Sequence, residues 1–273
     1  MVNQQISREK QGFAVGPIGG PTIVIDYGGV RLVTDPTLDP PAPAPGRPYA
    51  KLEGPALDGA ALGRADAVLL SHDEHGDNLD PAGRAYALEA ERIITGPGAA
   101  ARLGPPAVGL ERWQTTEVPR PDGATITITA LPAVHGPLDG ERDADGNVNC
   151  EVTGFLLTGD GLPVVYVSGD NASIAAVAEI AAHGGAIDVA ILFAGGARVP
   201  GKERGRPLTL TAPRAADAAV LLGAPTVVPA HYRGWSHYSE GAAELAAAFD
   251  DAGIAERLAV GEPGIWTIGP AGP

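Results

Sequence analysis

A segment rich in histidine and carboxylate directly follows an apolar run, and this arrangement limits the folds open to the chain. Residues 67–70 read Ala-Val-Leu-Leu, and residues 71–80 read Ser-His-Asp-Glu-His-Gly-Asp-Asn-Leu-Asp. Imidazole and carboxylate groups are the side chains that hold Zn²⁺, Mn²⁺ or Fe²⁺. A strand that ends in such a loop holds these groups on a rigid support and leaves a coordination position open for water. The segment therefore predicts a metal site at a strand end.

Three further motifs place a polar residue just after a strand-like run. They are Ala133-Val134-His135-Gly136, Tyr166-Val167-Ser168-Gly169-Asp170 and Val228-Pro229-Ala230-His231-Tyr232. Each resembles a ligand at a strand end, so His135, Asp170 and His231 join His72 and His75 as candidate ligands. Because the motifs must converge to form one site, we expect a single domain over residues 1–273.

The order of these motifs, a histidine-rich loop, then His-Gly, then Gly-Asp, then Pro-x-His, resembles the metallo-β-lactamase superfamily of metallohydrolases. Residues 26–38, which read DYGGVRLVTDPTL, and the short C-terminal half look most like the branch that contains L-ascorbate-6-phosphate lactonase. The resemblance implies an αββα sandwich, one or two divalent ions, with zinc favoured over manganese and iron, and a set of metal ligands. These ligands are His72, His75, Asp77, Asn78, His135, Asp170 and His231.

The family motif His-x-His-x-Asp-His is matched only in part. Either one residue is inserted between its first two histidines, or Asp73 occupies the first histidine position. We favour the insertion, which keeps His72 after a serine and keeps the spacing from His75 to Asp77. In both registers Asn78 stands where the family has its last histidine. An amide oxygen is a weaker ligand than imidazole, so we expect a weak second metal position.

Apolar and β-branched runs separated by glycine and proline predict alternating strands and helices. Hairpins are predicted in residues 21–36, about the turn at Gly28-Gly29, and about residues 159–161. Further strands are expected at 91–95, 123–131, 188–196 and 225–231, and helices at 81–90, 173–182 and from the cap Thr211 to Gly223. Such a pattern in two similar halves predicts a four-layer α/β fold, with two mixed sheets face to face and helices outside.

Two segments are predicted to border the site without entering a sheet. Residues 39–63 are rich in proline, which disfavours regular ladders, so we expect an extended loop that folds over the mouth of the site. The acidic run 139–149 lacks the last glutamate and the flanking helices of an EF-hand, so we expect a solvated lid beside His135 rather than a calcium site.

Basic and aromatic residues near the later motifs are candidates for substrate binding. The basic loop, which we define as Arg198, Lys202, Arg204 and Arg206, is either a solvated surface or an anion-binding arm. Aromatic and polar residues crowd behind His231 and are expected to line a pocket. They are Tyr232, Arg233, Trp235, His237 and Tyr238, and His237 is the best spare acid or base. His183 is expected only to end a helix.

Composition narrows the function classes. Nineteen basic and thirty-three acidic residues give a net charge of −14, which repels nucleic acid and anionic membranes. Cys150, the one cysteine, precedes Asp170 in a polar turn, which argues against a zinc β-lactamase. The N-terminal residues lack the apolar core of a secretory signal, and the most apolar stretch, 174–197, is interrupted by charges. We expect a cytoplasmic protein with a small-molecule substrate, and the sequence leaves open whether it forms a homo-oligomer.

The resemblance and the motifs together predict hydrolysis by a metal-bound hydroxide of a small anionic ester, lactone or phosphoester. Asp77 would bind the second metal or orient and deprotonate the water. Two alternatives remain open: a phosphodiesterase with two well-held metals, and a metal-binding or redox module without hydrolytic activity.

Overall fold

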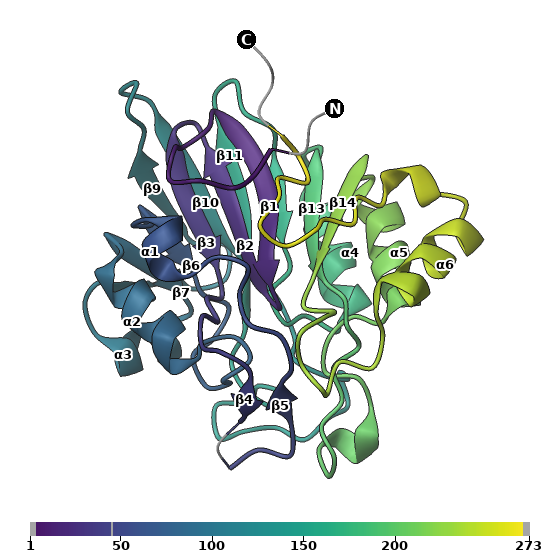
Figure 1. Cartoon of the computed structure of the whole chain (residues 1–273). Helices are drawn as coiled ribbons and strands as arrows, with labels where there is room; N and C mark the ends of the chain where they lie inside the picture. Colours follow the sequence, from purple (N-terminus) through teal and green to yellow (C-terminus); the bar gives the residue numbers. More distant parts are fainter. Residues whose placement is uncertain (1–3, 45, 270–273) are drawn as a thin grey trace.

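Two six-stranded mixed β-sheets face each other at the centre of the molecule, and helices cover their outer faces (Figure 1). The computed structural model describes residues 4–44 and 46–269. The first sheet has the order β1 (Phe13–Gly19), β2 (Thr22–Tyr27), β3 (Val30–Thr34), β6 (Ala67–Leu69), β7 (Arg92–Thr95) and β8 (Ala107–Gly109). The second has the order β14 (Thr226–Ala230), β13 (Val189–Phe193), β12 (Val165–Val167), β11 (Thr153–Gly159), β10 (Thr125–Pro132) and β9 (Thr115–Pro119).

Three helices cover each sheet, which completes the four layers. The first sheet carries α1 (Gly59–Leu62), α2 (Pro81–Glu89) and α3 (Pro97–Leu103). The second carries α4 (Ile174–Ala182), α5 (Ala212–Leu222) and α6 (Ala242–Asp251). Short 3₁₀ turns lie at Glu203–Gly205 and Ala255–Arg257. This arrangement confirms the αββα fold predicted from the sequence.

Alternation of side chains along the strands explains why both sheets are covered on both faces. In β2, Ile23 and Ile25 point between the sheets, where they join Phe155 and Ile191 of the second sheet in the central core. Val24 points the other way and packs in the cluster under α1 and α2. Strands buried on both faces are expected in sheets that helices cover.

Each half begins with antiparallel strands and continues with parallel ones. Strands β1, β2 and β3 are antiparallel, whereas β3, β6, β7 and β8 are parallel. Strands β9 to β12 are likewise antiparallel, and β12, β13 and β14 are parallel. The parallel strands therefore end at one edge of each sheet, and their following loops gather there.

Most predicted elements are present, and one prediction is wrong. The turn at Gly28-Gly29 has positive φ at both residues, as a tight hairpin requires. The proline-rich stretch is not wholly irregular, because β4 (Ala42–Pro43) and β5 (Ala50–Lys51) pair and α1 follows. Proline is tolerated here because both strands of a two-stranded sheet are edge strands, and each has one side that needs no ladder hydrogen bonds. The sequence patterns did not reveal the strands β1, β8 and β9 or the helices α3 and α6.

A buried ion pair fastens the N-terminal residues to the first sheet. Arg31 is 1% exposed, and its Nε and Nη2 donate to the two carboxylate oxygens of Asp26 at 2.8 Å each. Its Nη1 donates to the carbonyl oxygens of Ser7 and Leu62. The guanidinium group is thus paired in charge and in hydrogen bonds, which a buried arginine requires.

In the part of the chain that the structure describes, no helix combines the length and apolar character needed to cross a lipid bilayer.

Candidate metal centre

Four loops that follow strand ends bring the predicted ligands together. His72, His75 and Asp77 follow β6, and His135 follows β10. Asp170 follows β12, and His231 follows β14 with a positive φ of 56°. These segments lie at the same end of the molecule as β4 and β5 (Figure 1).

The first cluster contains three imidazoles whose nitrogens face one another. His72 Nε2 lies 2.8 Å from His75 Nδ1, and His135 Nε2 lies 3.1 Å from the same atom. The Sγ of Cys150 completes a group of four ligand atoms that all lie within 4.8 Å of one another. Sequence reasoning left Cys150 out of the site, because nothing in the local pattern relates residue 150 to the histidines.

The hydrogen bonds of the outer ring nitrogens fix which nitrogens carry lone pairs. His135 Nδ1 donates to the carbonyl oxygen of Leu208 at 2.9 Å, so its Nε2 is a lone-pair nitrogen. Ser71 Oγ donates to Asp35 at 2.6 Å and therefore accepts from His72 Nδ1 at 2.9 Å. Both Nε2 atoms thus present lone pairs toward His75 Nδ1, and a cation held among the three rings would satisfy them.

Burial keeps these imidazoles neutral, the form that binds metal. It lowers the pKa of His75 to about 4 and, with His75 nearby, that of His135 to about 3. Burial and the two neighbouring imidazoles lower the pKa of His72 well below its usual value. The donor set therefore fits a divalent ion.

A second cluster joins Asp77, Asp170 and His231. His231 Nε2 lies 3.3 Å from Asp77 Oδ2 and 3.3 Å from Asp170 Oδ1. Asp170 Oδ2 also lies 3.6 Å from His135 Nε2, so this carboxylate stands between the two clusters. A carboxylate in this place can contact ions at both clusters.

The charges of the second cluster are unequal. Burial favours the neutral form of Asp77, but hydrogen bonds from His231 and His237 outweigh it and lower its pKa well below the usual value. Burial raises the pKa of Asp170 to about 6. Burial disfavours charge on His231, but Asp170 and Asp77 raise its pKa. Two carboxylates and one imidazole carry the charge and the oxygen atoms that a second divalent ion prefers.

Asn78 lies beside the second cluster and contacts two carboxylates. Its amide nitrogen donates to Asp170 Oδ1 at 2.9 Å and to Asp35 Oδ2 at 3.0 Å. With an acceptor carboxylate on both sides, the amide is held with its nitrogen inward, and a nitrogen of this kind is not a metal ligand. Asn78 therefore orients Asp170 through its nitrogen, whereas metal binding by its Oδ1, which is buried and has no hydrogen-bond partner among the described residues, stays a prediction.

The choice of register across the histidine-rich loop follows from Asp73. Its carboxylate accepts from Arg102 Nη2 at 2.6 Å, and Arg84 lies 3.7 Å away. Asp73 therefore pairs with arginines outside the first cluster, whereas His72 and His75 both lie in it. This is the arrangement of the favoured register, with one inserted residue.

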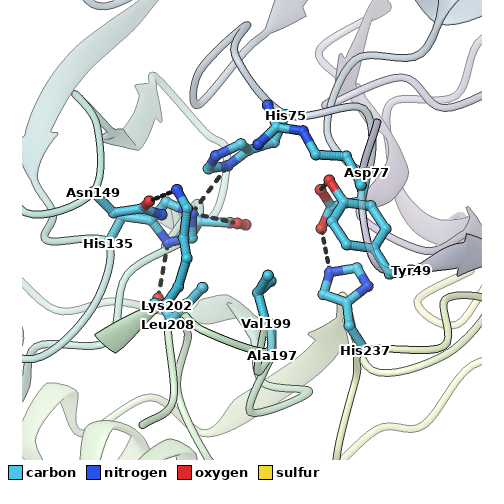
Figure 2. A pocket seen from close by; sticks show the side chains of 12 residues that line it. Tyr49, His75, Asp77, His135, Asn149, Ala197, Val199, Lys202, Leu208 and His237 are labelled. Atoms are coloured by element: carbon cyan, nitrogen blue, oxygen red, sulfur yellow. Dashed lines mark hydrogen bonds and ion pairs between the residues drawn. The ribbon is translucent and has the colours of Figure 1, made fainter. Parts of the chain in front are cut away.

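Figure 2 shows the cleft above the two clusters, with His237 pointing at Asp77. His237 Nε2 lies 2.8 Å from Asp77 Oδ2, and Tyr49 stacks on its ring with 4.1 Å between centroids. The Tyr49 hydroxyl lies 3.4 Å from Asp77 Oδ1, and burial raises the pKa of this phenol. Tyr49 belongs to the proline-rich stretch, so the prediction that this stretch folds over the site is confirmed.

The cleft encloses about 330 Å³, counted with the solvent at its mouth. Its lining includes His75 and His135 of the first cluster, Asp77 and Asp170 of the second, and two cations, Lys202 and Arg47. Lys202 Nζ donates to Asn149 of the predicted lid, so residues 139–149 do lie beside the site.

Other predicted substrate residues lie outside the lining of this cleft. Arg198 donates to Gly205 and Ser239, Arg206 pairs with Asp139, and Arg204 is exposed, so these three belong to the surface of the loop. Arg233 pairs with Glu53 on the surface.

Tyr232 packs in the core under α5, and Trp235 is buried behind Tyr49. The expected pocket wall is corrected to Tyr49 and His237, since only His237 of that segment reaches the cleft.

An acidic residue three positions after Asp77 ties the site to the proline-rich stretch. Asp80 caps α2 by accepting from Gly83 N, and it also accepts from the backbone nitrogens of Leu38 and Asp39. Lys51 Nζ lies 2.9 Å from its Oδ2 in a buried ion pair. The histidine-rich loop and the segment that carries Tyr49 are thus fastened to one carboxylate.

A four-layer sandwich with two ligand clusters at one sheet edge defines a metalloprotein of the αββα class. The family model described as "Beta-lactamase superfamily domain" matches residues 30–232. The chain belongs to this superfamily.

Relatives and solved structures agree with this assignment. The chain is 30% identical over 183 residues to a metal-dependent hydrolase from Methanosphaerula palustris, which covers 66% of this chain and 73% of that protein. It is 28% identical over 233 residues to a metal-dependent hydrolase from Pelotomaculum thermopropionicum, with 84% and 89% covered. The fold is similar to that of isothiocyanate hydrolase from Delia radicum gut bacteria, with a TM-score of 0.76, 21% identity, and 92% and 96% covered.

Changing Asp35 to asparagine is expected to weaken metal binding by about 10–100-fold. The single amide oxygen would accept from Ser71 N, so the amide nitrogen would face the Ser71 hydroxyl, and Ser71 would donate to His72 Nδ1 instead. The proton would then sit on His72 Nε2 and remove its lone pair from the first cluster. Competition with a metal chelator measures the change, and Asp58→Asn, at the exposed cap of α1, serves as the control. Equal affinities in the two variants would contradict this role.

Proposed function

We propose that the protein is a metal-dependent hydrolase that cleaves an ester, lactone or phosphoester bond in a small anionic molecule. The observation that carries the proposal is a single cleft with two ligand clusters at its floor and two cations, Arg47 and Lys202, in its lining. The curated relatives, described as metal-dependent hydrolases, support the reaction class. The net charge of −14 supports a small substrate rather than nucleic acid. The cytoplasm is the proposed compartment.

One or two divalent ions, zinc first, would be held by His72, His75 and His135 and by Asp77, Asp170 and His231. Such an ion lowers the pKa of water from about 15.7 to about 7 and polarises a carbonyl or phosphoryl oxygen. The protein's own residues then orient the reactants and move protons.

Asp77 and His237 are the residues proposed to handle the proton. Asp77 is ionised at neutral pH and accepts from His237 Nε2, which leaves the lone pair of the imidazole on Nδ1. That nitrogen is buried and has no hydrogen-bond partner among the described residues, so His237 is proposed to act through Asp77, which takes the proton from water. Tyr49 stays protonated and can donate a hydrogen bond to a substrate oxygen.

The test is metal analysis of protein purified without chelator, followed by hydrolysis assays with zinc, manganese or iron restored. The panel contains lactones, carboxylic esters and phosphoesters, each in an anionic and a neutral form. We expect turnover that requires metal and favours the anionic form of one bond type. Protein that binds metal but turns over no compound of the panel would favour a metal-binding module, and the hydrolase proposal would fail.

Changing Lys202 or Arg47 to glutamine is expected to raise KM for the anionic substrate about tenfold and to leave KM for its neutral analogue unchanged. A hydrogen bond to a charged group contributes about 1.5–3 kcal/mol, and 1.4 kcal/mol is a factor of ten. Arg204→Gln is the matched control, because it removes the same charge from the basic loop outside the cleft. If Arg204→Gln raises KM as much as Lys202→Gln, the effect is a general one of charge and the substrate contact is refuted.

A further inference from the structure

Cys150 lies within the first ligand cluster. It is 4% exposed, and its Sγ shares with one nitrogen each of His72, His75 and His135 a region in which all four atoms lie within 4.8 Å of one another. In the superfamily pattern described from the sequence, histidines hold the first metal position and no cysteine takes part. Cys150 would therefore be an additional ligand at that position. The independent sign of a ligand is that three ring nitrogens face one another there, two of them from buried histidines, since the Nε2 atoms of His72 and His135 both lie within 3.1 Å of His75 Nδ1.

The spacing fits a four-coordinate ion. Zinc binds nitrogen at about 2.0–2.1 Å and thiolate at about 2.3 Å in tetrahedral geometry, which separates neighbouring ligand atoms by about 3.4–3.6 Å. Two of the nitrogen–nitrogen separations are 2.8 and 3.1 Å, and no two of the four ligand atoms are more than 4.8 Å apart. The separations in the cluster therefore lie on both sides of the tetrahedral value.

The backbone around Cys150 is fixed on both sides. Asn149, with φ of 64°, accepts from Lys202 through its side chain, and the Glu151 carboxylate accepts from Gly98 N at 2.9 Å at the start of α3. Thr153 N donates to the carbonyl oxygen of Ser71, the residue before His72, at 3.1 Å. The thiol is therefore held against the histidine-rich loop by contacts that do not depend on the thiol itself.

We propose that Cys150 is a ligand of the first metal position and makes it a three-histidine, one-cysteine site. This proposal rests on the metal centre of the proposed function and adds a residue to it. When an ion binds, the thiol releases its proton to solvent and the thiolate takes the fourth place. Thiolate is a soft ligand that favours zinc and disfavours manganese, so Cys150 makes the first position selective for zinc.

Four protein ligands close a site, whereas sites that carry out chemistry keep a position open. Cys150 and His72 are not among the residues that line the cleft, but Asp77 and Asp170 are. The first ion would therefore be held tightly beneath the cleft, and the open coordination would lie toward the second cluster.

Cobalt(II) replacement tests the proposal in the full-length protein. Cobalt bound to thiolate shows an intense ligand-to-metal band in the near ultraviolet that imidazole and carboxylate do not give. We expect this band at one cobalt per chain in the unmodified protein, and its loss in Cys150→Ser with cobalt still bound. In Cys150→Ser, Zn²⁺ affinity should fall at least about 100-fold, which exceeds the usual loss when a residue that only hydrogen-bonds to a ligand is removed. Mn²⁺ affinity should fall less than about tenfold.

The control is Ser173→Ala, which removes the hydroxyl that caps α4 and should leave the band intact. Cobalt bound without the band in the unmodified protein overturns the proposal, whether or not the serine variant folds. Equal losses of zinc and manganese affinity overturn the selectivity. Hydrolysis without the band leaves the proposed function standing and removes Cys150 from the site. If the band is present but no tested substrate is hydrolysed, Cys150 remains a ligand and the proposed function fails.

Discussion

Changing His135 to alanine is expected to lower hydrolysis by at least about a thousandfold and to release bound metal. The residue contributes its Nε2 to the first cluster and lies 3.6 Å from the carboxylate of Asp170, so its loss disturbs both clusters. An ion that polarises a reacting oxygen supplies several kcal/mol of transition-state stabilisation, and 4 kcal/mol corresponds to about a thousandfold. His72→Ala and Asp170→Ala should act in the same way.

The measurement pairs kcat/KM with metal content after dialysis. His183→Ala is the matched control, since this histidine ends α4 and stacks on Trp113 at 3.7 Å between centroids, away from the cleft. The control should keep full activity and full metal content. Full activity of His135→Ala with metal in excess would refute the site assignment.

Changing Asp26 to alanine is expected to lower the free energy of unfolding by about 3–5 kcal/mol. The change leaves the Arg31 guanidinium charged and buried without its carboxylate, although three carbonyl oxygens still accept from it. Arg31→Met in the same protein should recover part of the loss, because it removes the unpaired charge.

Urea unfolding of the metal-free protein gives the required free energies. Glu91→Ala breaks the exposed pair with Arg64, whose partners are 60% and 57% exposed, and should cost less than about 1 kcal/mol. If Asp26→Ala and Glu91→Ala prove equally mild, the Asp26–Arg31 pair does not fasten the N-terminal residues to the sheet.

The fold and most of the ligands were accessible from the sequence because each ligand follows a strand of recognisable pattern. His72, His135, Asp170 and His231 all lie within a few residues of a buried strand end, where backbone geometry fixes the position of the side chain. Asp35 follows β3 in the same way, and this signal was available but not used.

Other site residues were not predictable because their contacts depend on how loops pack. Tyr49 and Cys150 come from segments with no periodic pattern, and nothing nearby in the sequence relates them to Asp77 or His72. The contacts of Asn78 were not predictable either, because the sequence does not show that Asp35 and Asp170 would both accept from its amide nitrogen. The basic loop was counted as one unit, whereas a single turn separates Lys202 in the cleft from its exposed neighbours.

The network at Asp80 couples the shape of the substrate cleft to the affinity for metal in this chain. Its carboxylate holds Leu38, Asp39 and Lys51 of the proline-rich stretch and caps α2 directly behind the loop of His72, His75 and Asp77. A substitution that reshapes the Tyr49 side of the cleft to accept a new substrate would pull on the ligand loop through this carboxylate. Laboratory evolution of a new substrate preference should therefore produce variants that lose metal affinity first and regain it only through second changes near α2.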